Sequence, residues 1–360
     1  MILDIALPLL FLFLLINICI VIILKRRPSL NPHFGKYLNI SVIIAAKNEE
    51  KIIHKLIDSL KKLDYPKENF EVIIIDDNSE DNTNNTISEL IWDLYNFHLY
   101  KADGKEFPAK KGALSIGIKK ADNPLILITD ADCQLQKDWL KSYSEKFCEG
   151  YDFILGNAPL IQDDLLINKV SCFENLRSSL LSFSAAATGF PYSASARNFG
   201  FKRSSFEKIK GYSNTVETLS GDDDLLLREA VKKNLRIGTV LNDGSFAYSA
   251  TKNKLTEYLN QRARHTKTSF YYLPGRQFFL AFWHLMNLFL LITPVLVFLN
   301  KFFILIFLIK LLVDLLTVKS LQKKFGYKFN FFEILYLQVI YELFLVIHFI
   351  NALFKKDKWK

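Results

Sequence analysis

Cysteine is scarce in this sequence, and internal repeats are absent. The 360 residues include four cysteines whose spacing is that of neither a disulfide framework nor a zinc site. We therefore expect reduced, small apolar side chains at Cys19, Cys133, Cys148 and Cys172. No tandem repeat or long low-complexity tract is present, so a repeat architecture is not indicated.

Half of the residues are hydrophobic, and many of them gather at the two ends of the chain. Residues 5–24 form an uncharged stretch of about the length that a bilayer needs, and Lys25, Arg26 and Arg27 follow at once. No small-x-small cleavage site closes this stretch, so a cleaved signal peptide fits poorly. We predict a transmembrane anchor over residues 1–27.

The C-terminal part holds three further apolar stretches, at residues 278–299, 302–318 and 331–354. The second contains Lys310 and Asp314, whose i, i+4 spacing allows them to pair inside a helix bundle. The third contains ionisable residues, so it either spans the membrane or lies partly in the interface. A membrane region of two or three helices is predicted over 277–354, followed by a basic tail over 355–360.

The net charge of +9 has two interpretations, attraction to anionic lipid or binding of nucleic acid. The apolar flanks favour membrane lipid as the partner, and no nucleic-acid partner is expected. If the basic residues 25–27 are cytoplasmic, the globular domain is too, which predicts an integral protein of the inner membrane. Three C-terminal spans would place the lysine-rich tail outside, so the number of spans and the side of the C-terminus stay open.

Residues 36–270 have the composition of a globular domain, with apolar strands alternating with amphipathic helices. The β-branched runs 40–46 and 72–75 are typical of buried strands, and the apolar spacing between them indicates an amphipathic helix capped by Asn48. Strand, helix and strand form a right-handed parallel unit, whose ligands gather at the carboxyl ends of the strands. An α/β domain with a mostly parallel sheet is expected.

Two predicted strands end in acidic residues. Asp76 and Asp77 follow the second strand, and Asp130 and Asp132 follow another apolar run. Such an Asp-x-Asp pair can hold a hard divalent metal against a phosphate, although a lone pair of this kind is more often a turn or a helix cap. Lys110 opens a predicted helix, where it either screens phosphate charge or lies in a solvated basic turn.

Three consecutive aspartates, Asp222 to Asp224, precede another predicted helix. One interpretation is an over-acidic helix start, capped by Ser220 or Asp222. The functional interpretation is that one carboxylate, its pKa raised by its neighbours, serves as a general base.

Together these motifs resemble the inverting family 2 glycosyltransferases. The resemblance covers about residues 38–270 in the family's order and implies a GT-A fold, a Rossmann-like and mostly parallel sheet, with membrane helices at both ends. The matching segments are AAKNEE (45–50), DDNSED (76–81), DAD (130–132), RNFGFKR (197–203), GDDDLLLR (221–228) and QRAR (261–264).

The resemblance also implies roles for single residues. Asp130 and Asp132 match the Asp-x-Asp that binds the diphosphate through Mg²⁺ or Mn²⁺. Asp222 matches the catalytic base, with Asp223 as its nearest competitor. The residues expected to contact the nucleotide sugar are Ala45, Lys47, Glu49, Asp76, Asp77, Lys110, Asp130, Arg262 and Arg264.

The implied reaction is inverting transfer of a hexosyl or N-acetylhexosaminyl group from a nucleotide-diphosphate sugar to a hydroxyl or phosphate acceptor. A lipid-linked or glycan acceptor of cell-envelope synthesis is expected. The amphipathic segment 165–187 fits the core for at least half of its length, and a lipid-linked acceptor is favoured if the segment lies on the bilayer surface. A nucleotidyltransferase and a non-catalytic membrane scaffold are the alternatives of other classes. The donor sugar and the oligomeric state stay open.

The sequence departs from the family pattern at one point. His265 stands where polymerising members have the Trp of their Gln-x-x-Arg-Trp element, so the aromatic platform for a growing chain is missing or replaced. A processive polysaccharide synthase is therefore the less favoured alternative. Arg262 and Arg264 suit a diphosphate clamp, and residues 255–270 also fit a basic amphipathic helix on the membrane surface.

Overall fold

A computed structural model of the chain describes residues 2–26 and 37–354. They form two compact units: a helical unit of residues 2–26, 162–185 and 251–354, and an α/β unit of residues 37–161 and 186–250. The predicted basic tail and the junction between the anchor and the globular domain lie outside the described residues.

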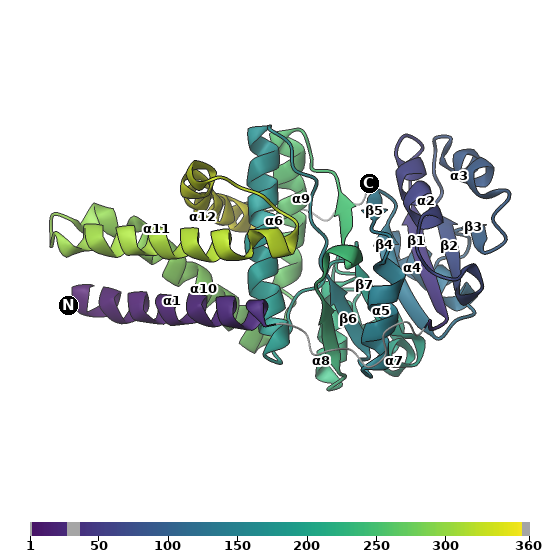
Figure 1. Cartoon of the computed structure of the whole chain (residues 1–360), viewed down its shortest axis with the longest axis horizontal. Helices are drawn as coiled ribbons and strands as arrows, with labels where there is room; N and C mark the ends of the chain where they lie inside the picture. The colour runs from purple at the N-terminus through teal and green to yellow at the C-terminus, as the bar shows by residue number, and fades with distance from the viewer. Residues whose placement is uncertain (1, 27–36, 355–360) are drawn as a thin grey trace. The chain divides into compact units, whose positions relative to one another are not determined.

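The α/β unit is built on a seven-stranded sheet (Figure 1). Four of its strand pairings are parallel, and only the two pairings of β7 are antiparallel, which confirms the predicted mostly parallel sheet. In sheet order the strands are β3 (Phe97–Lys101), β2 (Phe70–Asp76), β1 (Ile40–Ala46), β4 (Leu125–Asp130), β7 (Phe199–Lys202), β6 (Phe153–Gly156) and β8 (Ile237–Val240). A separate antiparallel pair joins β5 (Cys133–Leu135) to β9 (Ala247–Ser249).

Helices cover both faces of this sheet. On one face lie α2 (Ile53–Lys61), α3 (Thr83–Ile91) and α5 (Trp139–Cys148). On the other lie α4 (Ala109–Lys120), α7 (Arg203–Lys208) and α8 (Asp224–Lys232). The short 3-10 helices of this unit are η1 (Lys67–Asn69), η2 (Gly211–Asn214) and η3 (Asp243–Ser245).

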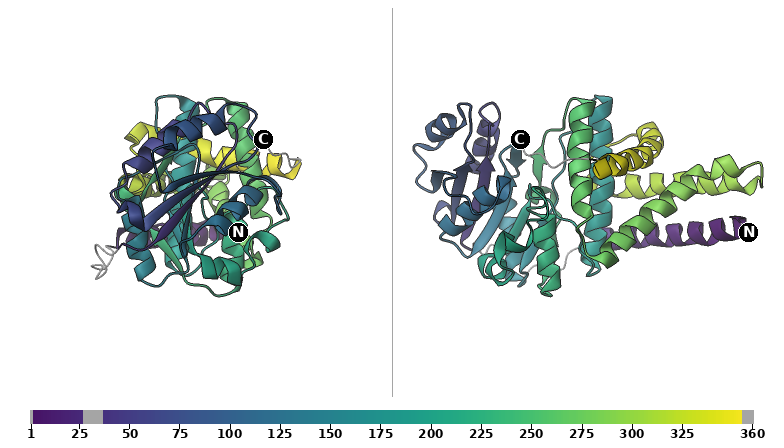
Figure 2. Two further views of the ribbon diagram at one scale, coloured as in Figure 1. Left: turned by 90° about the vertical axis from the view of Figure 1, so that its right-hand side faces the viewer. Right: turned by 180° about the vertical axis from the view of Figure 1, so that it is seen from behind.

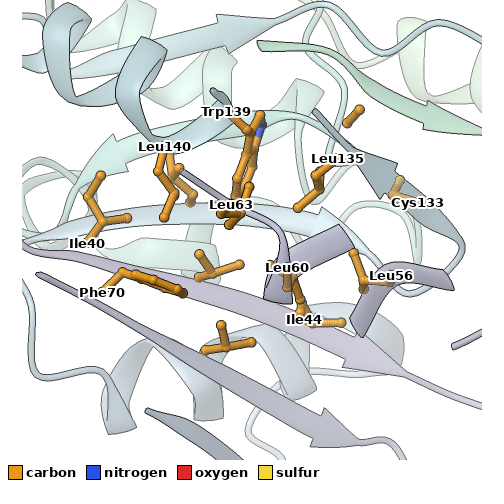
Figure 3. Packing of buried hydrophobic residues seen from close by; sticks show 14 of the residues in the cluster. Ile40, Ile44, Leu56, Leu60, Leu63, Phe70, Cys133, Leu135, Trp139 and Leu140 are labelled. Atoms are coloured by element: carbon orange, nitrogen blue, oxygen red, sulfur yellow. The ribbon is translucent and has the colours of Figure 1, made fainter. Parts of the chain in front are cut away.

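The two hydrophobic cores follow from the alternation of side chains along each strand. Ile40 and Ile44 of β1 point to the face covered by α2 and α5, where they pack near Leu60 and Trp139 (Figure 3). Ile43, of the opposite parity, lies in the core under α4. A strand that is buried on both faces has apolar residues at consecutive positions. The apolar run at residues 40–46 therefore predicts a strand.

The predicted helix cap at Asn48 is wrong. Helix α2 begins at Ile53, and Asn48 adopts a left-handed backbone with φ of 56°. Its side-chain Oδ1 accepts a hydrogen bond from the Glu80 backbone N–H at 2.8 Å. Asn tolerates this left-handed conformation better than most residues, so here it forms a turn between strand and helix.

The helical unit contains α1 (Ile2–Lys25), α6 (Leu166–Ala187), α9 (Leu255–Ser269), α10 (Pro274–Ile292) with η4 (Thr293–Leu296), α11 (Phe302–Leu321) with η5 (Gln322–Phe325), and α12 (Phe331–Phe354). Helix α1 packs along α10 and α11, and α12 packs against α9 and α11 (Figure 2). Within the described residues, three helical segments are long and apolar enough to cross a membrane, namely Ile2–Lys25, Pro274–Leu296 and Phe331–Phe354. These agree with the predicted anchor and C-terminal membrane helices.

Helix α11 carries charged side chains that the apolar helices enclose. Lys310 and Asp314 are fully buried, and their side chains pair at 2.8 Å as their spacing predicted. Arg177 of α6 adds a second ion pair to Asp314 at 2.7 Å. Pairing offsets the large cost of removing such charges from water.

Candidate active site

The acidic strand ends lie on one rim of the sheet, as predicted. In the register of the parallel strands, Ala46 at the end of β1 is opposite Asp76, and Ala45 is opposite Asp130. The two aspartates therefore flank the carboxyl end of β1 on either side. This is the edge at which open parallel sheets bind their ligands.

Asp76 and Asp77 are both almost fully buried, but they make different contacts. Asp76 accepts hydrogen bonds from the Ser79 backbone N–H and from the Asn84 side chain, both at 3.1 Å. Asp77 pairs with the ammonium of Lys105 at 2.6 Å.

The loop after β1, with Lys47 and Glu49, is fastened to the loop after β2. Lys47 is half-buried there, and the Glu49 backbone N–H donates to the Thr83 hydroxyl at 2.8 Å. The Asn48 backbone N–H donates to the Ser79 hydroxyl at 3.0 Å. These hydrogen bonds hold the two loops together beside the carboxyl ends of β1 and β2.

Lys110, in the first turn of α4, joins two acidic motifs that are far apart in the sequence. Its ammonium lies 2.5 Å from Asp130 Oδ1 and 2.8 Å from Asp222 Oδ2. Burial would lower the pKa of this ammonium, but Asp130 and Asp222 outweigh burial and raise the pKa well above its usual range. The structure thus brings the Asp-x-Asp motif and the candidate base to a common cation, which spacing along the chain does not show.

The first two residues of the aspartate triplet differ in their electrostatics. Burial would raise the pKa of Asp222, but Lys110 outweighs burial and holds the pKa of this carboxyl below its usual range. For Asp223, burial and the carboxylates of Asp224 and Asp222 raise the pKa well above its usual range. The expectation of a raised pKa is therefore wrong for Asp222, which is ionised and able to accept a proton at neutral pH.

Asp223 is the cap of helix α8, in place of the predicted Ser220 or Asp222. Its Oδ1 accepts from the Asp224 backbone N–H at 2.7 Å, and its Oδ2 accepts from the Ala196 backbone N–H at 2.8 Å. Both carboxylate oxygens of Asp223 are therefore bound to backbone N–H groups, whereas Asp222 pairs with the Lys110 side chain.

Lys111 is a buried residue next to the site that the sequence did not single out. Its side chain is buried, and its ammonium donates to the backbone carbonyls of Thr215 and Thr218, the latter at 2.8 Å. It thereby fastens the loop before Asp222 to α4. Two adjacent lysines in a sequence do not reveal that one binds carboxylates and the other binds backbone.

Comparison with known proteins identifies the family. Residues 41–210 match the model of glycosyl transferase family 2. This segment, just under half of the chain, is therefore a glycosyl transferase family 2 segment. Asp222 and helix α8 lie beyond the matched segment but within the same α/β unit.

Curated relatives of this family 2 chain match over short segments. The beta-monoglucosyldiacylglycerol synthase of Trichormus variabilis is 37% identical over 101 residues, which are 28% of this chain and 22% of that protein. The dolichyl N-acetyl-alpha-D-glucosaminyl phosphate 3-beta-D-2,3-diacetamido-2,3-dideoxy-beta-D-glucuronosyltransferase of Methanococcus voltae is 37% identical over 108 residues, 30% of this chain and 33% of that protein. The chain thus spans about a fifth to a third of the length of these relatives.

A solved structure resembles the family 2 chain over nearly its whole length. It is the mannosyltransferase PcManGT from Pyrobaculum calidifontis, in complex with GDP-Man and Mn²⁺, with a TM-score of 0.62 at 15% identity. The match covers 98% of this chain and 96% of that one. At this identity the likeness shows the fold, and the α/β unit has the GT-A architecture that the motifs implied.

The chemistry around the Asp-x-Asp motif of the family 2 domain suits a hard divalent metal. The Asp130 side chain is 32% exposed and Asp132 is half-buried, so both carboxylates can be reached. Burial raises the pKa of the adjacent Cys133 thiol. No three His, Cys, Asp or Glu side chains converge as a metal site within residues 2–26 and 37–354. Mg²⁺ commonly uses one or two carboxylates and completes its shell with phosphate and water, so the two aspartates fit.

The arginines of the QRAR segment belong to the helical unit. The Arg262 guanidinium pairs with Glu174 of α6 at 2.6 Å, and Tyr258 donates its hydroxyl to the same carboxylate. Burial would raise the pKa of Glu174, but Arg262 and His348 bring it down to about 2. Arg262 therefore has a structural partner, and the diphosphate clamp of Arg262 and Arg264 stays a prediction.

Proposed function

We propose that this family 2 chain is an inverting glycosyltransferase, which moves a sugar from a nucleotide-diphosphate sugar to a lipid-linked or glycan acceptor in cell-envelope synthesis. The observation that carries the proposal is the Lys110 bridge. The Lys110 ammonium binds both Asp130 and Asp222, so a base at Asp222 would lie beside a diphosphate held at Asp130.

On the donor side, Ala45, Lys47 and Glu49 contact the nucleotide. Asp76 and Asp77 accept hydrogen bonds from its base or ribose. Asp130 and Asp132 would hold Mg²⁺ or Mn²⁺, which when bound offsets the charge of the leaving diphosphate. The structurally similar mannosyltransferase is in complex with GDP-Man and Mn²⁺, which supports this assignment.

On the acceptor side, Asp222 takes the proton from the attacking hydroxyl. The acceptor oxygen bonds to the anomeric carbon as the bond from that carbon to the diphosphate breaks, and the nucleoside diphosphate leaves with the bonding electrons. Attack from the opposite face inverts the anomeric configuration. Lys110 keeps Asp222 ionised before the proton arrives, and general-base help of this kind is worth roughly a hundred- to ten-thousandfold in rate.

The membrane setting supports a lipid-linked acceptor. The names of the two relatives mention diacylglycerol and a dolichyl phosphate sugar. The basic residues after α1 favour a cytoplasmic α/β unit attached to the inner membrane. His265, in place of the family's Trp, favours a single transfer over processive synthesis.

The proposal is tested with membranes that contain the full chain and a panel of radiolabelled nucleotide sugars. We expect one donor to release nucleoside diphosphate and to label the lipid or glycan fraction. A chelator that removes divalent metal should stop both the release and the labelling. Released pyrophosphate would instead indicate a nucleotidyltransferase. Absence of turnover of every donor, with Asp130→Ala membranes as the background, would contradict the proposal.

A further inference from the structure

The segment of residues 188–196, between α6 and β7, is the feature from which we infer the acceptor class. Its sequence is TGFPYSASA, with two aromatic rings, hydroxyl groups and no charged side chain. Phe190, Tyr192, Ser193 and Ser195 are all partly exposed. We call residues 188–196 the aromatic-hydroxyl segment.

The first anchor of the aromatic-hydroxyl segment is the aspartate triplet itself. Asp224 Oδ1 accepts hydrogen bonds from the Ser193 hydroxyl at 2.9 Å and from the Ala194 backbone N–H at 2.8 Å. The Ala196 backbone N–H donates to Asp223 at 2.8 Å. The segment is thus tied to the two residues that directly follow the candidate base.

The second anchor lies beside the Asp-x-Asp motif. The carbonyl of Arg197, just after the segment, accepts a hydrogen bond at 2.9 Å from the hydroxyl of Thr129, which directly precedes Asp130. The Asn198 backbone N–H then donates to the Ser195 carbonyl at 2.8 Å and closes a turn. The C-terminal half of the segment, residues 193–196, is therefore fixed to the residues that follow the candidate base, and Arg197, directly after the segment, is bound next to Asp130.

The aromatic-hydroxyl segment itself contains no charged side chain with which to bind an anionic acceptor. The acidic residues tied to it are Asp223 and Asp224, and the preceding Asp222 meets Asp130 at Lys110. Of the cations nearby in the fold, Lys110 pairs with Asp130 and Asp222, whereas Lys111 and Arg197 donate to neutral oxygens, Arg197 to the Ser249 hydroxyl at 2.6 Å. A divalent metal would be offset by the diphosphate of the donor. A phosphate arriving as the attacking group would find no cationic side chain in the segment to pair with, whereas a neutral hydroxyl needs none.

We propose that the aromatic-hydroxyl segment binds the acceptor, and that the acceptor group is a neutral hydroxyl of a saccharide, carried on a glycolipid or glycan, and not a lipid phosphate. The inference rests on the proposed glycosyl transfer and narrows its acceptor. Aromatic rings offer an apolar face to a sugar ring, and Ser hydroxyls both donate and accept hydrogen bonds, as sugar hydroxyls require. Asp223 and Asp224 act as positioning residues that hold this surface against the base.

The test uses the purified full chain in lipid nanodiscs, with the nucleotide sugar that it turns over, and two kinds of acceptor probe. One is a set of alkyl glycosides of glucose, galactose and N-acetylglucosamine together with a neutral glycolipid extract, and the other is a long-chain polyprenyl phosphate. We expect label in a neutral product whose linkage survives mild acid. Label in an acid-labile polyprenyl phosphate sugar, or nucleoside diphosphate release with no neutral product, overturns the inference but leaves glycosyl transfer standing. No diphosphate release from any donor overturns both.

A substitution tests the segment itself. Tyr192→Ala should raise the acceptor KM about tenfold, the loss of one aromatic contact, with the donor KM within experimental error. Tyr95→Ala is the matched control, because Tyr95 is 70% exposed after α3 and outside the segment. An acceptor KM for Tyr192→Ala equal to that of the control overturns the assignment of the segment.

Discussion

The three consecutive aspartates at the start of α8, Asp222 to Asp224, make three different sets of contacts. Asp222 pairs with Lys110, Asp223 caps the helix, and Asp224 holds the Ser193 hydroxyl. Gly221, with φ of 80°, turns the chain just before them. The sequence indicated an acidic cluster, but which carboxylate turns toward the site depends on this local backbone geometry.

At this scale we predict that Asp223→Ala destabilises the protein without removing the base. The substitution leaves two buried backbone N–H groups without their acceptor, so the free energy of unfolding of the α/β unit should fall by about 1–3 kcal/mol. Denaturant unfolding followed by a probe in this unit measures the loss, and Asp223→Asn, which keeps an acceptor oxygen, should lose less. Equal stability of wild type and Asp223→Ala would contradict the capping role.

At the element scale, α4 organises the site from one end. Gly117 lets this helix lie close on the sheet, since a Cβ there would come within 2.5 Å of Ile43 Cγ2. The first turn of the helix then presents Lys110 to the carboxylates and Lys111 to the loop that carries Asp222. A single helix therefore positions both the charge and the backbone of the reaction centre.

We predict that Lys111→Met reduces transfer although Lys111 touches no reacting group. Met keeps the length of the side chain but donates no hydrogen bond, so the loop at Thr215 and Thr218 loosens and kcat should fall about tenfold or more. Lys119→Met on the same helix is the matched control, because its side chain is 68% exposed. Steady-state kinetics of both variants decide the matter, and equal kcat values would show that the loop needs no such anchor.

Much of the α/β unit could be predicted from the sequence, because its determinants are local. Buried strands read as apolar runs, and parallel connectivity brings Asp76 and Asp130 to one rim without knowledge of any contact. The turn at Asn48, the cap at Asp223 and the anchor at Lys111 could not be predicted in this way. Each depends on a hydrogen bond to a specific partner, which lies from one to more than a hundred residues away. The type of a residue does not indicate which partner it binds.

At the scale of the whole molecule, the ion pairs of the helical unit also differ in whether the sequence predicts them. Pairs between neighbours on one helix are predictable, and pairs between distant residues are not. The Lys310–Asp314 pair was predictable because both residues share one helix face. The Arg262–Glu174 pair was not, since 88 residues separate its members. The QRAR segment therefore has a structural explanation that its motif does not reveal.

The membrane arrangement predicts which surfaces face which compartment. With the α/β unit in the cytoplasm, the turn between η4 and α11 should face the outside. In a cysteine-free background, Lys301→Cys should react with a membrane-impermeant maleimide in intact cells, whereas Lys61→Cys of α2 should react only after lysis; both lysines are exposed. Labelling of Lys61→Cys in intact cells would contradict the cytoplasmic placement.

The assignment of the reaction centre is tested most directly by Asp222→Asn in the full chain. Asn keeps the size of the side chain and an oxygen for Lys110, but it cannot accept the proton of the acceptor. Transfer should fall by roughly a hundred- to ten-thousandfold, while equilibrium dialysis shows the nucleotide sugar still bound. Near-normal turnover by Asp222→Asn would contradict the assignment of Asp222 as the base.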